Sequence, residues 1–340
     1  MAGIKFLHLP PNVQNKVLDS VDAGDLTGFA QTSSRAKTIA KDQQRCFKAA
    51  LCSFNFTRDK EMEIILFNQA NRCVVCFLMK RIQNDDRPGN DNTVDISWTG
   101  EPTEENRMSA FRRVVEHVLD VFVTEEFHVF MDEPFNLRDS FVWDLATAPT
   151  HLRLRKTGNQ PIPISADNCK FALEELSIGY LSISADVDPS YTCSTPLRSR
   201  TVILHTAHWL KLEAILGMTT KHLALYDSDD SLSNREVQKI LNVWKNGGLR
   251  TLKTLTMHSN AQEELAIDRK MKLKSYLRGL ETFPWDKENR PAKHTSLGKT
   301  VDLSTAKDFR SNDGRLASMD FLQTTGLHIV FWRRKRHASF

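Results

Sequence analysis

The sequence predicts an α+β protein, in which a small three-helix unit precedes an α/β body that ends in an antiparallel hairpin. Three observations lead to this prediction. Three short amphipathic patterns fill residues 5–45, helix and strand patterns alternate from residue 106 onward, and a turn-forming Asp-Gly pair at 313–314 precedes two strand-like segments. Helix–strand alternation is typical of parallel strands covered by helices.

The first helix is predicted from a proline start and an apolar side. Leu9-Pro10-Pro11 precedes the helical pattern, and proline suits a first turn because its missing N–H has no partner there in any case. Val13, Val17, Leu18 and Val21 then recur at helical spacing. These four residues are expected to form the apolar side of the helix.

Two more short helices are predicted to follow. Asp22-Ala23-Gly24 is expected to end the first helix, Asp25 to cap the second, and Ser33 or Ser34 to begin the third. Three helices of this length bury little surface by themselves. They are therefore expected to pack on a neighbouring domain or on a partner.

The middle of the chain becomes clearer toward residue 106. Apolar runs at 63–66 and 73–79 fit strands, although period alone does not separate short strands from buried helix. A polar hairpin or loop is expected at 83–93. Beyond it, apolar spacing predicts a helix over 108–122 and a strand over 127–131.

The next part of the body is predicted to continue the alternation. Leu137, Phe141 and Leu145 have the spacing of a second helical side, and His151–Leu154 alternates like a strand. Leu173–Ile178 has the Leu-x-x-Leu-x-apolar form of a leucine-rich-repeat strand.

A clearer repeated pattern of strands and helices follows. Strands are expected at 201–204, 223–225 and 252–257, with helices at 209–216 and 233–244 between them. Ser233 with Glu236 forms the capping box of the second helix. Strands that recur every 20 to 32 residues or so predict a degenerate leucine-rich-repeat-like body. Asp313-Gly314 favours a hairpin turn, with final strands at 316–321 and 327–332.

The N-terminal unit resembles the F-box in the order and spacing of its residues. The residues that carry the resemblance are Leu9-Pro10, Val13, Val17-Leu18, Asp25-Leu26, Phe29 and Thr32–Lys37. The unit is most similar to the version common in nematode F-box families. The resemblance implies that it docks on the Skp-type adaptor of a cullin–RING ubiquitin ligase.

The same resemblance implies which side chains contact the adaptor. They are the Leu-Pro pair and the apolar residues of the first two helices: Leu9, Pro10, Val13, Val17, Leu18, Leu26 and Phe29. Gly28 and Gln31-Thr32 depart from the family pattern, and these departures are expected to weaken docking. The alternative is an ordinary three-helix cap on the larger domain.

Two later segments are similar to the type 2 F-box-associated domain. They are Trp209–Met257 and Phe309–Met319, the latter followed by Phe331-Trp332. The resemblance implies an F-box at 5–45, a connecting segment at 46–105, an F-box-associated α/β domain at 106–335 and a tail at 336–340. The part of that domain most similar to the family lies at about 205–260.

Together the resemblances imply a substrate-recognition subunit that performs no catalysis itself. The body would bind an unknown target protein, with the polar connections Tyr226–Asn234 and Ser259–Arg269 as candidate contacts. One alternative is a leucine-rich-repeat-like interaction scaffold that does not engage a ubiquitin ligase. An undetected enzyme and a nucleic-acid binder are two further alternatives.

Composition favours a protein of the cytoplasm, the nucleus or both. The sequence has no apolar stretch of 18 residues and no secretory signal, so no membrane contact is expected. A net charge of +4, scattered over 340 residues, argues against nucleic-acid binding. The basic run Arg333–His337 is expected to be solvated, with nuclear import as the alternative.

No motif in the sequence predicts a catalytic residue, a cofactor or a metal. Cys73-Val-Val-Cys76 lacks the second ligand pair of a zinc site, and the histidines are dispersed. No phosphate-binding loop and no nucleophile elbow is present. Trp209 and Trp244 are expected to be core residues, with partner binding as the minority reading.

Overall fold

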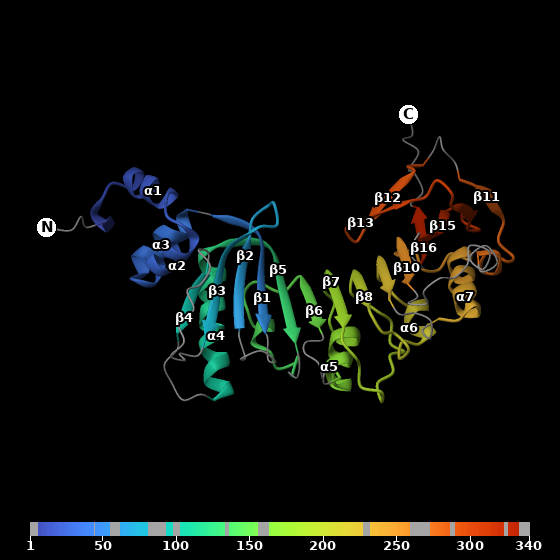
Figure 1. Cartoon of the computed structure of the whole chain (residues 1–340), viewed down its shortest axis with the longest axis horizontal. Coiled ribbons are helices and arrows are strands. Elements are labelled where there is room, and N and C mark those ends of the chain that lie inside the picture. The colour runs from blue at the N-terminus through green and yellow to red at the C-terminus, as the bar shows by residue number, and fades with distance from the viewer. Residues whose placement is uncertain are drawn as a thin grey trace. The chain divides into compact units, whose positions relative to one another are not determined.

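The structure is a computed structural model that describes residues 6–43, 45–54, 62–80, 93–97, 103–132, 136–155, 163–226, 232–258, 273–285, 290–322 and 326–332. The chain forms two compact units, Met1–Arg153 and Leu154–Phe340, whose elements are labelled in Figure 1. The predicted loop at 259–269, the basic run at 333–337 and the tail at 336–340 lie outside the described residues, as do residues 83–92 of the loop predicted at 83–93 and residues 227–231 of the connection at 226–234.

The three predicted N-terminal helices are present. They are α1 (Pro11–Asp19), α2 (Ala23–Gln31) and α3 (Ser34–Asp42), preceded by the 3₁₀ turn η1 (Phe6–His8). Ser33 caps α3, because its hydroxyl accepts the N–H of Ala36 at 3.1 Å. Of the two serines that the sequence left open, Ser33 is therefore the cap.

Helix α2 begins earlier than predicted. The carboxylate of Asp22 accepts the N–H of Asp25 at 2.8 Å, so Asp22 is the N-cap and the assignment of Asp25 was wrong. Asp25 lies in the first turn, where its charge is favourable at the positive end of the helix dipole. Gly24 lies inside α2 and does not end a helix. It lets α2 approach β4 (Thr93–Ser97), since a Cβ there would lie 2.7 Å from Cγ2 of Val94.

The first unit contains a mixed sheet. Its other strands are β1 (Cys46–Phe54), β2 (Met62–Phe67), β3 (Cys73–Lys80) and β5 (Val123–Asp132), in the order β5-β1-β2-β3-β4. The β5–β1 and β3–β4 pairs are parallel, and the two pairs between them are antiparallel. Both apolar runs of the middle segment are thus strands, and the strand expected at 127–131 is confirmed.

Helix α4 (Glu104–Val121) confirms the helix expected at 108–122. It buries Phe111, Val115 and Val118 completely. The ring of Phe111 packs against those of Phe54 on β1 and Phe141, with centroids 5.4 and 6.2 Å apart. These aromatic contacts form the core between α4 and the sheet.

The helix predicted for Leu137, Phe141 and Leu145 was wrong. Only a short 3₁₀ turn, η2 (Phe141–Trp143), forms there. The indole of Trp143 donates to the carbonyl oxygen of Leu137 at 2.6 Å, so a side chain takes an acceptor that a helix would use internally. All three apolar residues are nevertheless buried. Their spacing therefore predicted burial correctly, but it predicted the wrong backbone conformation.

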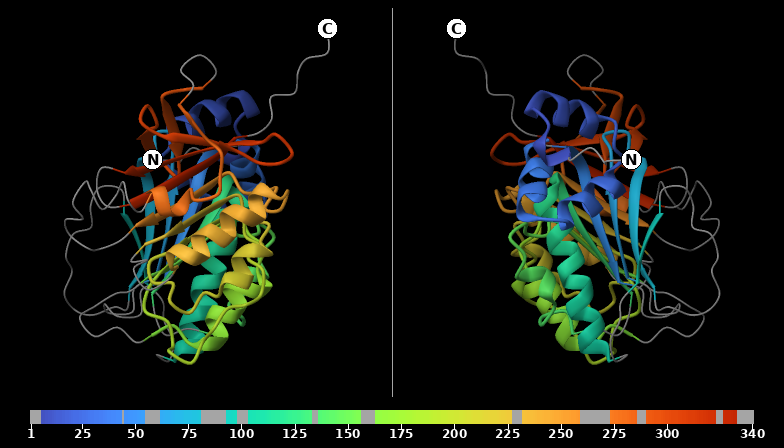
Figure 2. Two further views of the ribbon diagram at one scale, coloured as in Figure 1. Left: turned by 90° about the vertical axis from the view of Figure 1, so that its right-hand side faces the viewer. Right: turned by 90° about the vertical axis from the view of Figure 1, so that its left-hand side faces the viewer.

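The second unit begins with parallel strands that neighbour one another in chain order. They are β7 (Tyr180–Ser184), β8 (Thr201–Leu204), β9 (His222–Leu225) and β10 (Thr254–His258), and β6 (His151–Arg155) lies at the division between the units. The segments between them contain α5 (Ala166–Lys170), η3 (Phe171–Glu175), α6 (Leu212–Leu216) and α7 (Asn234–Lys245). These helices lie on one face of the parallel strands (Figure 2). The leucine-rich-repeat character of this arrangement stays a prediction.

The strand predicted at Leu173–Ile178 was wrong. Ser165 caps α5 by accepting the N–H of Asn168, and the helical path continues through the π-turn η3 to Glu175. Leu173 is buried from this helical turn. The strand itself, β7, begins only at Tyr180.

The later elements match their predictions closely, except that α6 begins at Leu212, so Trp209 lies before the helix predicted at 209–216. Both predicted side-chain bonds of the Ser233–Glu236 capping box are present at the start of α7. Trp244, on α7, and Trp209, which precedes α6, are 0% and 3% exposed, so both are core residues.

The chain ends in antiparallel strands, as predicted. Next to β10 come β16 (Gly326–Trp332), β15 (Leu316–Leu322), β14 (Lys307–Arg310) and β11 (Thr282–Pro284), while β12 (Lys293–Ser296) and β13 (Lys299–Asp302) form a separate pair. Gly314 has a φ of 81° in the β14–β15 turn, a conformation that favours glycine. Among the described helices, none is both long enough and apolar enough to cross a bilayer.

Candidate protein-interaction surface

Two of the three N-terminal helices are held against the rest of the first unit. Helix α2 contacts β3 and α4, and α3 contacts α4, as the blue and teal helices in Figure 2 show. Nζ of Lys37 and of Lys41 lie 2.5 and 2.6 Å from the carboxylate oxygens of Asp120 on α4. Nε2 of His117 lies 3.2 Å from the carbonyl oxygen of Thr27. These sides of the helices are therefore used within the chain.

The two lysines on α3 lower the pKa of Asp120. Hydrogen bonds from Lys37 and Lys41 hold the pKa of Asp120 below its usual value. All three side chains are partly exposed, at 38–46%. Exposed ion pairs contribute only about 0–1 kcal/mol. The lysines therefore orient α3 on α4 more than they stabilise it.

A small core holds the three helices to one another. Leu18 and Leu26 are 3% and 0% exposed. The guanidinium of Arg45 donates to the carbonyl oxygens of Leu18 and Val21 at 2.5 and 2.7 Å, which fixes the turn between α1 and α2. Phe29 packs edge-to-face on Phe6 with ring centroids 5.2 Å apart. The unit is thus packed internally without help from its outer face.

The outer face of α1 is apolar and uncovered. Val13 and Val17 are 38% and 42% exposed, and residues four apart lie on the same side of a helix. Pro10 and Pro11 at the start of α1 are also exposed. In the described part of the chain, the only other large apolar side chain exposed to this degree is Val123, at 54%. Two of three such residues therefore share one face of one short helix.

The structure separates the seven predicted contact residues into three groups. Pro10, Val13 and Val17 are exposed, and Leu9 and Phe29 are half-buried. Leu18 and Leu26 are buried within the unit. Apolar type alone did not distinguish these groups, because a helix with two apolar sides has the same residue types on both.

Sequence reasoning did not single out Phe6, the edge-to-face partner of Phe29. It is an apolar residue three positions before Leu9-Pro10, which is the only signal that could have marked it. Pro11 was used only as a helix start, and its ring is exposed in the structure.

Residues 6–48 match the family model of the F-box domain. The matched range begins at η1, contains α1, α2 and α3, and ends inside β1. The F-box expected from the sequence is therefore confirmed, and F-box domains bind Skp-type adaptors in cullin–RING ligases. No curated protein and no solved structure matches the chain. The nematode-type version and the type 2 F-box-associated domain stay predictions.

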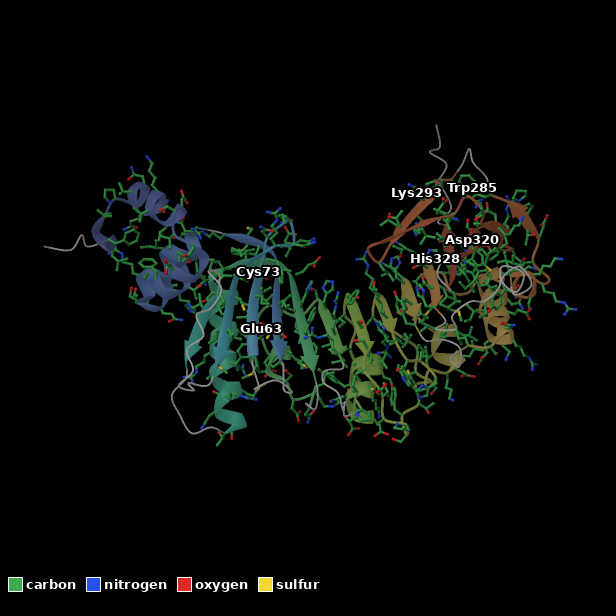
Figure 3. The ribbon with its side chains drawn as sticks, in the orientation of Figure 1. Glu63, Cys73, Trp285, Lys293, Asp320 and His328 are labelled. Carbon is green, nitrogen blue, oxygen red and sulfur yellow. The ribbon has the colours of Figure 1, made fainter. Side chains whose placement is uncertain are left out.

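The Cys73–Cys76 pair belongs to one strand of the first unit. Both residues lie on β3, and the register shift of the β2–β3 pairing next to Cys73 leaves Cys73 opposite Phe67 and Cys76 opposite Ile65. The Cys76 thiol donates to Oε2 of Glu63 at 3.7 Å. Burial and the nearby Glu63 carboxylate of β2 raise the pKa of the Cys73 thiol (Figure 3). A raised pKa disfavours the thiolate that metal binding and redox chemistry require.

The parallel strands of the second unit have a polar face opposite their helices. Leu223 on β9 lies in register with Val202 and Leu255, which are buried toward the helices. The alternate residues form three rows across β7–β10 and β16: Tyr180, Thr201, His222, Thr254 and Val330; Ser182, Ile203, Ala224, Thr256 and His328; Ser184, His205, Tyr226 and His258. The third row lies at the carboxyl ends of the strands, where loops begin.

Three rings of the third row form a continuous stack. The His205–Tyr226 and Tyr226–His258 centroids are 4.7 and 4.5 Å apart, with interplanar angles of 12° and 5°. Gly326 on β16 makes room for this stack, because a Cβ there would lie 2.8 Å from Nδ1 of His258. The predicted contact loops start at Tyr226 and directly after His258. The stack therefore lies at the base of both loops.

Proposed function

We propose that this chain is a substrate-recognition subunit of a Skp–cullin–F-box E3 ubiquitin ligase. Its F-box binds the Skp-type adaptor, and its second unit binds a target protein. The observation that carries the proposal is the uncovered apolar face of α1, on an F-box whose α2 and α3 already pack within the chain. An apolar face left open in this way is typical of a surface that a partner covers.

The proposed chemistry is proximity alone. The ubiquitin-charged enzyme performs the transfer, and this chain holds the target lysines near it, which raises their effective concentration. F-box proteins are generally non-enzymatic, and we propose no catalytic residue here. Anchoring α2 and α3 on α4 and β3 keeps the F-box in a fixed position on the first unit. A fixed position is what a proximity mechanism needs.

The proposed contact residues follow from their exposure. Val13, Val17 and Pro10 would enter the adaptor directly, with Leu9 and Phe29 at the edge of the contact. Leu18 and Leu26 would act by holding the helices in place, since both are buried. A side chain that a partner buries at the centre of an interface can contribute about 2 kcal/mol or more to binding.

The test compares two substitutions of exposed valines. Val13→Asp combined with Val17→Asp is expected to weaken adaptor binding by more than about tenfold, because it places charge in a desolvated apolar contact. Val123→Asp makes the same chemical change at an exposed valine outside residues 6–48, and it should bind like the wild type. Binding is measured by titrating the purified adaptor. Circular dichroism checks that both variants are folded.

A second comparison addresses the start of α1. Leu9→Ala combined with Pro10→Ala should also reduce co-purification of the adaptor. Equal recovery of adaptor with the wild type, this variant and the valine double variant would contradict the proposal. That outcome would favour the leucine-rich-repeat-like scaffold that does not engage a ligase.

We place the target-binding surface of the second unit at the ring stack. Stacked, partly exposed rings offer flat contact area with little loss of side-chain entropy on binding. The adjoining loops at 226–234 and 259–269 would add specificity. Tyr226→Ala is expected to reduce recovery of the target protein while adaptor binding is unchanged, because Tyr226 lies outside the F-box.

A further inference from the structure

We propose that Glu126, His128 and His151 form a binding site for a divalent first-row transition-metal ion of the zinc class. One carboxylate oxygen and one nitrogen from each imidazole lie within 4.8 Å of one another. All three residues belong to the first unit. The inference does not depend on the proposed ligase function.

The two strands place these side chains on one surface. Glu126 and His128 are two residues apart on β5, so they point to the same face, opposite to the buried Phe127 and Val129. β5 and β6 are neighbours in the sheet (Figure 1), and His151 is the first residue of β6. Nε2 of His128 lies 2.8 Å from Oε2 of Glu126. The centroids of the two imidazoles are 4.0 Å apart.

A hydrogen-bonded threonine orients the third ligand. The Thr150 hydroxyl donates to the carbonyl oxygen of Phe127 and accepts its N–H, both at 3.1 Å. Its single proton is thus used, so it accepts from Nδ1–H of His151 at 2.9 Å. This bond places the ring proton of the neutral imidazole on Nδ1 of His151. Metal-binding histidines are commonly oriented in this way by a second hydrogen bond.

The donor set selects the class of ion. Two imidazoles and one carboxylate, with no thiolate, suit zinc and its neighbours in the first transition row. Such ions bind nitrogen and carboxylate oxygen at about 2.0–2.2 Å. Three protein ligands leave a position for water or for a side chain of a partner. Calcium and magnesium are disfavoured, because both prefer oxygen ligands.

The imidazoles are neutral at physiological pH, as metal binding requires. Burial, together with the neighbouring His128, lowers the pKa of His151 to about 4. Burial also lowers the pKa of His128, although Glu126 opposes this effect.

Two nearby positive charges limit the affinity of the site. Arg153 on β6 and Lys48 on β1 both disfavour a positive charge on His128, and the Arg153 guanidinium lies over the ring of Phe130, 4.9 Å from its centroid. The Glu126 carboxylate is the one negative group among the three ligands. Removing one of the cations should therefore strengthen binding.

The site is tested by titrating the full chain with zinc and with cobalt(II). The wild type should bind one equivalent at pH 7.5, and Glu126→Gln and His151→Gln should each weaken binding by about tenfold or more. His208→Gln, at an exposed histidine in the second unit, should bind like the wild type. Lys48→Gln should bind more tightly. Glu126→Gln is nearly isosteric, so it keeps the test valid if His151→Gln fails to fold.

The cobalt spectrum separates this site from a cysteine site. Cys46 and Cys73 are exposed and offer the competing ligands. Nitrogen and oxygen ligation gives visible d–d bands without the thiolate charge-transfer band of the near ultraviolet. A strong thiolate band would overturn the proposal. So would the absence of binding, or binding that neither Glu126→Gln nor His151→Gln weakens.

Discussion

Two glycines in α2 have opposite surroundings. A Cβ on Gly24 would lie 2.7 Å from Cγ2 of Val94 and 3.7 Å from Cγ2 of Val75, whereas a Cβ on Gly28 would meet nothing within 4 Å. Gly24→Ala should therefore lower the free energy of unfolding by about 1–3 kcal/mol through overpacking. Gly28→Ala should raise it by about 0.5–1 kcal/mol, because alanine loses less backbone entropy in a helix. Urea unfolding of both variants measures the difference.

The contact itself is isolated by a second substitution. Val94→Ala removes the methyl groups that Gly24→Ala would strike, so the double variant should recover most of the stability lost by Gly24→Ala. If Gly24→Ala costs the same with and without Val94, the effect comes from the α2 N-terminus and not from close packing on β4.

Single residues also show where sequence reasoning reaches its limit. The choice of Asp25 as the α2 cap followed from Gly24 as a helix breaker, but the glycine serves close packing against a strand seventy residues later in the chain. Likewise, Val13 and Leu18 are both apolar residues of α1, yet one faces outward and the other is buried. Both distinctions depend on tertiary contacts that local patterns do not encode.

One arginine joins two elements of the second unit. The Arg315 guanidinium binds both carboxylate oxygens of Asp313 through Nε, at 3.0 and 2.9 Å. It also donates to the carbonyl oxygens of Trp244 and Gly248 at 3.1 and 3.3 Å, and lies over the Trp244 ring. Trp244 packs in turn on Phe309 and Phe331. Arg315 thereby ties the β14–β15 hairpin to the end of α7.

Removing this connection should destabilise the second unit. Arg315→Ala is expected to lower the free energy of unfolding by about 2–3 kcal/mol, since it removes several charge-assisted hydrogen bonds, two of them to backbone carbonyl oxygens at the end of α7. Arg315→Lys should lose a smaller part, because lysine keeps the charge without the forked geometry. Arg198→Ala, at an exposed arginine, is the control. A loss no larger than that of the control would show that α7 is held by its apolar face alone.

The elements predicted best are those with a local signature. The α7 capping box, the Asp313-Gly314 turn and the Leu-rich strands β9 and β10 lie where the sequence places them. The elements predicted wrongly, at 137–145 and 173–178, have buried apolar residues at helix-like or strand-like spacing. Burial was read correctly at 137–145, whereas at 173–178 only Leu173 of the three apolar residues is buried. Backbone conformation there was decided by Trp143 and by the Ser165 cap.

At the scale of the whole molecule, both units contain partly or fully buried histidines on a sheet face, and burial favours their neutral form. His151 in the first unit and His222 and His328 in the second have pKa values lowered to about 4, chiefly by burial. None of them was predicted to matter, because the histidines are scattered in the sequence. The pairing of strands brings them to one face of their sheets, and strand pairing is a long-range property that sequence spacing does not show.

These histidines predict a loss of stability in mild acid. Their folded pKa is below the unfolded value of about 6.5, so the unfolded state binds more protons between the two values. The stabilisation is complete above about pH 6.5 and is lost as the pH falls toward 4. His328 is 2% exposed, and its Nδ1 is hydrogen-bonded to the hydroxyl of Thr256 at 2.8 Å. It alone should account for about 2 kcal/mol between pH 7.5 and pH 5.

The contribution of His328 is separated from the others by substitution. His328→Asn should be less stable than the wild type at pH 7.5, but its stability should fall less between pH 7.5 and pH 5, because one titrating group is gone. His208→Gln, which removes an exposed histidine, should keep the wild-type dependence. Urea unfolding at the two pH values gives each difference. An identical acid loss in His328→Asn and the wild type would mean that His328 stays neutral in the unfolded chain as well, or that the folded sheet admits its charge without cost.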